Sequence, residues 1–387
     1  MRKKTSLLIG LLVLTISLIV TGCGKTTSEI ESSNTDTDNL VSMADGGEIE
    51  IKEIYIDIDT KSWEAILDAP LDEEYYSATV TIGDETVSNI GFRTKGNSTL
   101  QFVANSESER YGFRVNIDKY EDDQTICGTN EFVLNSSFAD PSYMREYITY
   151  MAMEEIGGIT PEISYANLYI NNEYYGLYIY IEAYDDTFVE GVTDDEDACL
   201  YKADGENCSL ESSTGTSGFD EQYGDDEEME NIDRLIAAIE EADNGNYEDL
   251  EEILDVDSVL RAMAINYLCG NYDSYAGDKA HNYYLLYADG EFTYIGWDYN
   301  MAFGAYSPDS GASLSVDADE PIYNTTLEDR PLYKVMLANE EYVKQYYIYL
   351  DELAEYLSNW EEIVKGIEVE IQVIPNDKVV KVADLLK

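Results

Sequence analysis

The stretch that most constrains the fold runs over residues 271–304 and reads NYDSYAGDKAHNYYLLYADGEFTYIGWDYNMAFG. Aromatic and β-branched residues flank an Asp-Gly pair at 289–290, which favours a tight type I′ turn and predicts an antiparallel hairpin. Pairing about this turn brings the two ends of the hairpin together. We therefore predict a metal or phosphate site at these ends. Its residues are Asp273, His281, Asn282 and Asp298.

The charge of the chain limits what such a site can bind. The sequence has 80 acidic and 23 basic residues, with a formal net charge of -57. This charge repels nucleic acid and anionic lipid headgroups, so we expect no nucleic-acid partner. Binding of a polyanion such as a nucleotide then depends on a local cluster of the scarce cations or on a divalent metal, which carboxylates suit.

Residues 1–22 are predicted to be a lipoprotein signal peptide. A basic start precedes an apolar run that is too short for a comfortable membrane span, and the run ends in Val-Thr-Gly-Cys, which resembles a bacterial lipobox. This pattern implies cleavage before Cys23 and a diacylglyceryl group on its thiol. An ordinary signal peptide or a membrane anchor with a chance cysteine is the alternative. Residues 23–47 are polar and predict a flexible tether, so we expect an extracytoplasmic protein held to the membrane only by its lipid.

Four further cysteines leave the disulfide state open. An even number in an exported chain permits two disulfides, with Cys199 and Cys208 the closest pair in sequence, but four free thiols are an equal alternative. No Cys-x-x-Cys or Cys/His cluster points to zinc.

A second candidate site lies where a predicted strand, 86–95, enters a turn. Arg93 and Lys95 alternate on one face of this strand and meet the turn Gly96-Asn97-Ser98, whose N–H groups and hydroxyl suit an anion. A basic strand end followed by an ordinary turn is the alternative. A later strand, 110–117, is predicted to place Arg110 and Arg114 on one face.

The remaining pattern is that of an α+β domain. Asp140 and Pro141 predict the start of a helix that reaches about residue 156. Residues 165–182 predict a second hairpin with Asn171-Asn172 at the turn, and residues 204–230 an acidic insertion with almost no core-forming residues. Helices are expected at 231–241, 249–254, 258–268, 332–337, 341–357 and 361–368.

Several segments, in order, resemble the CotH kinase family, the spore coat protein H type of atypical protein kinase. They are IGFRTKGNST, FVLNSSFADPSYMREYITYMAMEEIG, YANLYINNEYYGLYIYIE, LYK, NYDS, HNYYLLY and IGWDYNMAFG. The resemblance implies a two-lobed, kinase-like α+β fold with antiparallel hairpins and C-terminal helices over residues 48–370. It also implies ATP-dependent phosphorylation of Ser/Thr in surface or exported proteins with Mg²⁺ or Mn²⁺. The tail, 371–387, stays unassigned.

The resemblance also implies roles for the candidate residues. Asp273 would accept the proton of the acceptor hydroxyl, Asp298 and Asn282 would hold the metal, and His281 would pack or orient. Nucleotide phosphate would meet the cations and the turn, and the full set of these residues is Arg93, Lys95, Gly96, Asn97, Ser98, Arg110 and Arg114.

The chain departs from the family pattern at three places. Asn300 stands where the family has the second acid of Trp-Asp-x-Asp, which makes one metal contact neutral. The basic run before residue 110 is reduced to Asn-Ser-Glu-Ser-Glu, and Lys95 replaces the arginine of Arg-Gly-Asn. These changes keep open an alternative, a catalytically weak binding or adhesion module displayed on the same fold. Little favours a two-carboxylate glycoside hydrolase.

Overall fold

The computed structural model describes residues 51–359 except 139, 206, 227 and 307–314, together with Ile363. All of them belong to one compact unit, Val41–Lys387. The predicted signal peptide, Cys23, the tether and the tail lie outside the described residues, as does almost all of the helix expected at 361–368. No helix within the described part of the chain is long and apolar enough to cross a membrane.

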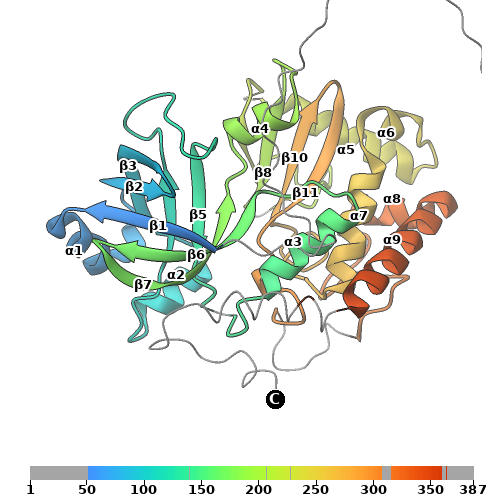
Figure 1. Cartoon of the computed structure of the whole chain (residues 1–387). Helices are drawn as coiled ribbons and strands as arrows, with labels where there is room; N and C mark the ends of the chain where they lie inside the picture. Colours follow the sequence, from blue (N-terminus) through green and yellow to red (C-terminus); the bar gives the residue numbers. More distant parts are fainter. Residues whose placement is uncertain are drawn as a thin grey trace, which may run out of the picture. The chain divides into compact units, whose positions relative to one another are not determined.

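Seven strands form a closed barrel (Figure 1). Parallel pairing of β1 (Ile51–Ile58) with β6 (Ile163–Ile170) closes it, and every other pair in the barrel is antiparallel. The remaining strands, in spatial order, are β2 (Tyr76–Ile82), β3 (Glu85–Lys95), β4 (Gly112–Asn116), β5 (Glu131–Asn135) and β7 (Glu173–Glu182).

Alternation along the strands separates an apolar barrel interior from a polar exterior. Phe92 and Phe113 are fully buried inside, whereas their neighbours Arg93 and Arg114 are only partly buried on the outer face. Helix α1 (Thr60–Asp68), capped by Asp59, adds Trp63 to this aromatic cluster. A short helix, α2 (Ser98–Ala104), follows β3.

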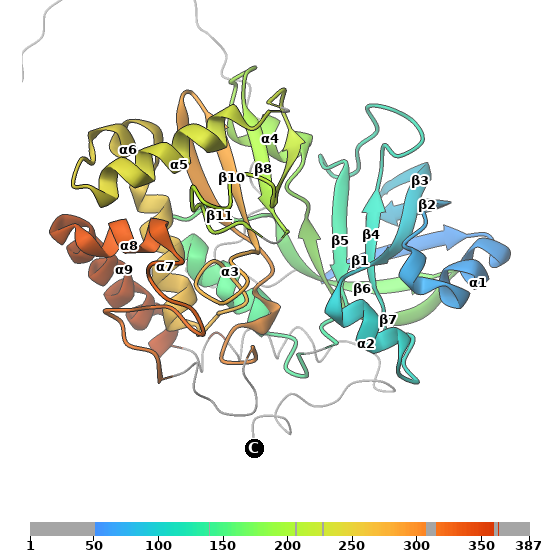
Figure 2. The ribbon, with the colours of Figure 1, turned by 180° about the vertical axis from the view of Figure 1, so that it is seen from behind.

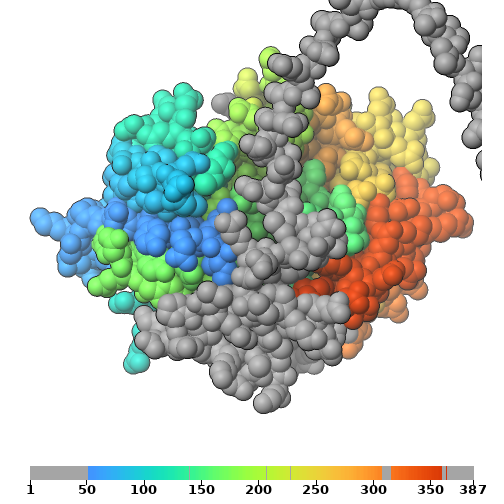
Figure 3. All heavy atoms as spheres, viewed as in Figure 1, coloured from blue at the N-terminus to red at the C-terminus, as the bar shows by residue number. Residues whose placement is uncertain are grey.

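A second sheet has the order β11 (Glu291–Gly296), β10 (Tyr283–Ala288), β8 (Cys199–Ala203) and β9 (Phe219–Tyr223), all antiparallel. Figure 2 shows it from behind, beside the helices that share its core. In the space-filling view of Figure 3, the C-terminal helices and the first barrel strands lie on opposite sides of the face shown. The helices are α3 (Arg145–Glu155), α4 (Asp186–Val192), α5 (Glu230–Asp243), α6 (Glu248–Ile253), α7 (Val256–Leu268), α8 (Pro331–Ala338) and α9 (Glu340–Ser358).

The mixture of helices and strands confirms the predicted α+β class, and both predicted hairpins are present. Asn171 and Asn172 have φ of 52° and 66°, and Asp289 and Gly290 have φ of 53° and 90°. Positive φ at both central residues is the geometry of a type I′ turn, whose twist matches that of the paired strands.

Two expectations differ from the structure, and the disulfide state that the sequence left open is settled. Helix α3 begins at Arg145, not after Asp140, because the Asp140 carboxylate accepts the N–H groups of Ser142 and Arg145 in a turn that precedes the helix. The segment 204–230 contains strand β9, so the expectation of an insertion almost without core residues is wrong there. Its buried residues include Cys208, Leu210 and Phe219. Cys127, Cys199, Cys208 and Cys269 are all free thiols.

Candidate functional site

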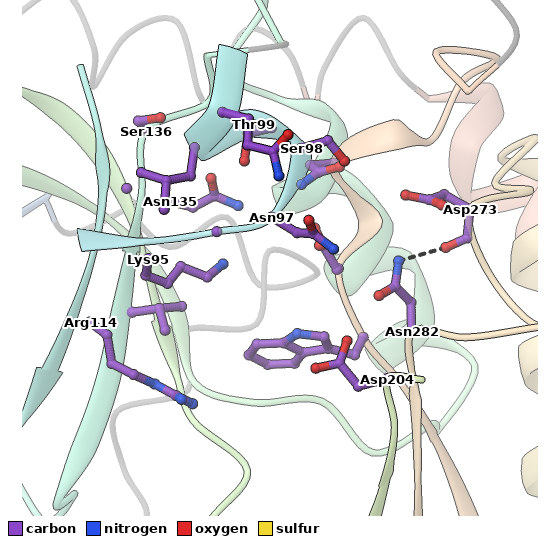
Figure 4. Close-up of a pocket in the computed structure, with 18 of the residues that line it drawn as sticks. Lys95, Asn97, Ser98, Thr99, Arg114, Asn135, Ser136, Asp204, Asp273 and Asn282 are labelled. Carbon is purple, nitrogen blue, oxygen red and sulfur yellow. Dashed lines mark hydrogen bonds between the residues drawn. The ribbon is translucent and has the colours of Figure 1, made fainter. Parts of the chain in front are cut away.

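A pocket of about 520 Å³ lies between the outer face of β3–β5 and one end of the second sheet. Figure 4 shows Lys95, Arg114 and Asn135 on the barrel side of this pocket, and Asp204, Asp273 and Asn282 on the opposite side. The pocket brings together most of the residues predicted from sequence. These are Arg93, Lys95, Gly96, Asn97, Ser98, Arg114, Asp273, His281, Asn282, Asp298 and Asn300.

The barrel side supplies the cations, but most of their charge is already neutralised. Arg93 forms an ion pair with Glu73, and Arg114 Nη2 lies 2.7 Å from Glu131 Oε1. The side-chain ammonium of Lys95 has no hydrogen-bond or ion-pair partner within the described part of the chain. Lys95 is therefore the barrel cation that is available to a ligand.

The turn after Lys95 depends on its glycine. Gly96 has φ of +130°, and a Cβ at this position would lie 3.0 Å from Thr99 Oγ1. A side chain is disfavoured there by both the backbone and the contact. The turn presents Asn97 and Ser98 to the pocket (Figure 4).

Asp298 reaches the pocket directly after β11. Its backbone is left-handed, with φ of 59°, and its N–H donates to the Tyr150 hydroxyl at 3.3 Å. Burial raises the pKa of the Asp298 carboxyl, Lys95 opposes the rise, and the charge of Asp273 adds to it. Oδ1 of Asp298 is buried and has no hydrogen-bond partner among the described residues, and such an oxygen suits a cation.

The pKa of the Asp273 carboxyl is shifted in the opposite direction. Burial would raise the pKa of its carboxyl, but the hydrogen bond from His281 and the charge of Lys279 outweigh burial and lower it. Asn282 Nδ2 also donates to the Asp273 carbonyl oxygen at 2.8 Å (Figure 4). Asp273 is thus an ionised carboxylate that is held through both its side chain and its main chain.

The side chains of the pocket can be compared with the ligands that a metal ion requires. The described residues contain no group of three His, Cys, Asp or Glu side chains placed to hold an ion. Mg²⁺, however, commonly takes one or two carboxylates and completes its shell with phosphate oxygens and water. The partnerless Oδ1 of Asp298, with the side chains of Asn282 and Asn300 in the same pocket, fits this mode.

Arg110 does not line this pocket. Strand β4 begins at Gly112, so the expectation that Arg110 shares a strand face with Arg114 is wrong. Arg110 donates to the Ser136 carbonyl at 2.8 Å and to that of Leu177, and its guanidinium lies 4.9 Å from the Tyr178 ring centre. It lines a different pocket beside Trp63.

Sequence reasoning missed a buried acid, Glu146, in the first turn of α3. Its Oε2 accepts from Asn135 Nδ2 at 2.6 Å. Burial and the charge of Asp298 raise the pKa of Glu146 to about 8, although Lys95 opposes the rise. An acid in a first helical turn is typical of an exposed start, so only the tertiary structure identifies this residue.

Lys202 and Asp204, an ion pair at 2.6 Å, were also missed among the residues that line the pocket. Lys202 stands in the middle of β8, where strand alternation could have placed it on the pocket face.

Comparison with known proteins identifies the family of the chain. The family model described as CotH kinase protein matches residues 92–383, so the chain belongs to the CotH family and the resemblance seen in the sequence is confirmed. The chain is also 29% identical over 193 residues to the inner spore coat protein H of Bacillus subtilis (strain 168). This match covers 47% of the chain and 52% of that relative, so the chain spans about half the length of the relative.

Proposed function

We propose that the protein is an atypical kinase that transfers the γ-phosphate of ATP to Ser or Thr hydroxyls of surface or exported proteins. The proposal includes a two-lobed, kinase-like organisation, with the barrel as one lobe and the second sheet with its helices as the other. It also includes an extracytoplasmic location and a lipid anchor at Cys23, which the lipobox-like sequence favours.

One observation carries the proposal. The pocket joins an available cation, Lys95, to a partnerless buried carboxylate oxygen on Asp298 and an ionised carboxylate on Asp273. Phosphoryl transfer needs these three groups, because its catalysis rests on positioning and on stabilisation of phosphate charge.

In the proposed reaction, the acceptor hydroxyl oxygen attacks the γ-phosphorus and its proton passes to the Asp273 carboxylate. The bond between the γ-phosphorus and the bridging oxygen breaks, and ADP leaves with that electron pair. Lys95 contacts the nucleotide phosphates, and the charge of buried Glu146 interacts with the charges of Lys95 and Asp298. Asp298, Asn282 and Asn300 would hold Mg²⁺ or Mn²⁺, which neutralises charge on the phosphate oxygens when bound.

The test is incubation of the purified domain with γ-labelled ATP, Mg²⁺ or Mn²⁺ and an acceptor protein. We expect transfer of label to the acceptor or to the domain itself, and loss of transfer in Asp298→Ala. Absence of label with either metal and with every acceptor would contradict the proposal.

Two observations favour a second function, a binding module on the same fold. Asn300 is neutral, and the described residues contain no group of three His, Cys, Asp or Glu side chains placed to hold an ion, and both features would weaken metal binding. Such a module would show no metal-dependent heat with ATP in calorimetry.

A further inference from the structure

The hydrogen bonds of Asp273 distinguish its two carboxylate oxygens. Oδ1 lies 2.7 Å from His281 Nε2 and 3.5 Å from Lys279 Nζ. Oδ2 has no hydrogen-bond partner in the described part of the chain. We infer that His281 is a positioning residue which fixes Oδ1 and thereby presents Oδ2 to the hydroxyl of the acceptor. The inference rests on the proposed function.

The backbone around His281 supports this role. Ala280 and Asn282, on either side of it, both have left-handed conformations, with φ of 51° and 58°. Residues other than glycine adopt this region at a cost, and such costs persist where the surrounding structure imposes them. Here the sheet imposes the geometry, because Asn282 N–H donates to the Ala203 carbonyl and the Asn282 carbonyl accepts from Trp297 N–H.

The same two residues bond both parts of Asp273. His281 bonds the carboxylate and Asn282 Nδ2 bonds the main-chain carbonyl. The loop that carries Asp273 is therefore attached to the start of β10 at two points. Fixing one oxygen restricts the rotation of the carboxylate, and a base held in position favours efficient proton transfer.

Lys279 lies near the same oxygen of Asp273, but its side chain is much more exposed to solvent than that of His281. Its side chain is 51% exposed, whereas those of His281 and Asp273 are 17% and 14% exposed. A half-exposed ammonium at 3.5 Å contributes little to orientation. Lys279→Met is therefore the comparison variant, because it changes the charge beside Asp273 and leaves the hydrogen bond from His281 in place.

The kinetic test compares three variants in the full domain. His281→Leu removes the donor, and we expect kcat for acceptor phosphorylation to fall by ~10- to 100-fold with KM for ATP unchanged. His281→Gln places an amide N–H within reach of Oδ1 and is expected to recover most of the loss. Lys279→Met removes a nearby charge but keeps the orienting hydrogen bond, so kcat should fall less than in His281→Leu. Equal losses in His281→Leu and His281→Gln, or a loss confined to KM for ATP, would overturn the inference.

A second measurement does not depend on catalysis. The chain has one histidine, so its imidazole N–H resonance in a nitrogen-15 NMR spectrum is assigned without ambiguity. We expect a slowly exchanging, downfield N–H signal in the wild type and its disappearance in Asp273→Ala. A wild type without this signal contradicts the inference about His281. A wild type with the signal but without phosphate transfer contradicts the proposed kinase activity instead.

Discussion

The two sides of the pocket differ in which of their charged groups already have a partner. On the barrel side, Arg93 and Arg114 are paired with Glu73 and Glu131, whereas Lys95 has no ion-pair partner in the described part of the chain. On the sheet side, Asp298 keeps a buried carboxylate oxygen that has no hydrogen-bond partner among the residues that the structure describes. Within this pocket, acids thus neutralise Arg93 and Arg114, whereas Lys95 and Asp298 keep charged groups that a ligand can meet.

The difference teaches that charge in the sequence is a poor guide to charge offered to a ligand. Three cations of the barrel strands were equal candidates by alternation, yet Arg93 and Arg114 have partners on other segments, Glu73 and Glu131, that alternation does not reveal. We therefore expect mutation of a charged group without a partner to change ligand binding, and mutation of a paired group to change mainly stability.

The largest expected effect is that of Asp298→Asn. Because this variant removes the carboxylate that would hold the metal, phosphate transfer should fall by at least about 100-fold. The melting temperature should stay unchanged or rise, since a buried charge without a partner is lost. Kinetic assays and thermal unfolding measure the two outcomes. A strongly lowered melting temperature would show that Asp298 is structural.

Lys95→Met should have the second-largest effect. It removes the available cation, and we expect ATP affinity in calorimetry to weaken by ~10- to 100-fold. Lys202→Met is the matched control, because Lys202 is already paired with Asp204 at 2.6 Å. Equal losses in the two variants would contradict the distinction between available and paired cations.

Glu146→Gln tests the buried acid through the pH dependence of stability. The folded pKa of about 8 lies above the ordinary value of 4.5, so between these values the folded state holds a proton that the unfolded state has released. The free energy of unfolding should therefore fall as pH rises through this window, by up to about 1.4 kcal/mol for each pH unit.

The Gln variant lacks this slope and should become the more stable protein near pH 8. Denaturant unfolding between pH 5 and pH 9 gives both curves. Parallel curves would show that Glu146 does not keep its proton on folding.

Arg114→Gln should have the smallest effect, and that effect should fall on stability. It leaves Glu131 without its ion pair at a cost of about 1 kcal/mol, since Arg114 and Glu131 are 27% and 13% exposed. Further substitution of Glu131→Gln should restore part of the loss. ATP affinity should change less than in Lys95→Met. A larger loss of affinity than in Lys95→Met would make Arg114 a ligand residue.

The sequence predicts the local structure well where turn chemistry is strong. Asp289-Gly290 and Asn171-Asn172 define both hairpins, and the first of them carries Asn282 and Asp298 to one pocket. Prediction fails where long-range contacts decide. The parallel pairing of β1 with β6 and the burial of Glu146 depend on segments that no local pattern connects. Arg110 precedes its strand because β4 begins two residues later than alternation indicated.

The central claim is that the two sides of the pocket form one nucleotide and metal site. Calorimetry of ATP binding with and without Mg²⁺, on the wild type, Asp298→Asn and Asp273→Asn, tests it most directly. The account predicts metal-dependent binding in the wild type, loss of the metal dependence in Asp298→Asn, and retention in Asp273→Asn, whose carboxylate acts only on the acceptor hydroxyl. Binding that is absent from the wild type, or that does not depend on metal, would contradict the account.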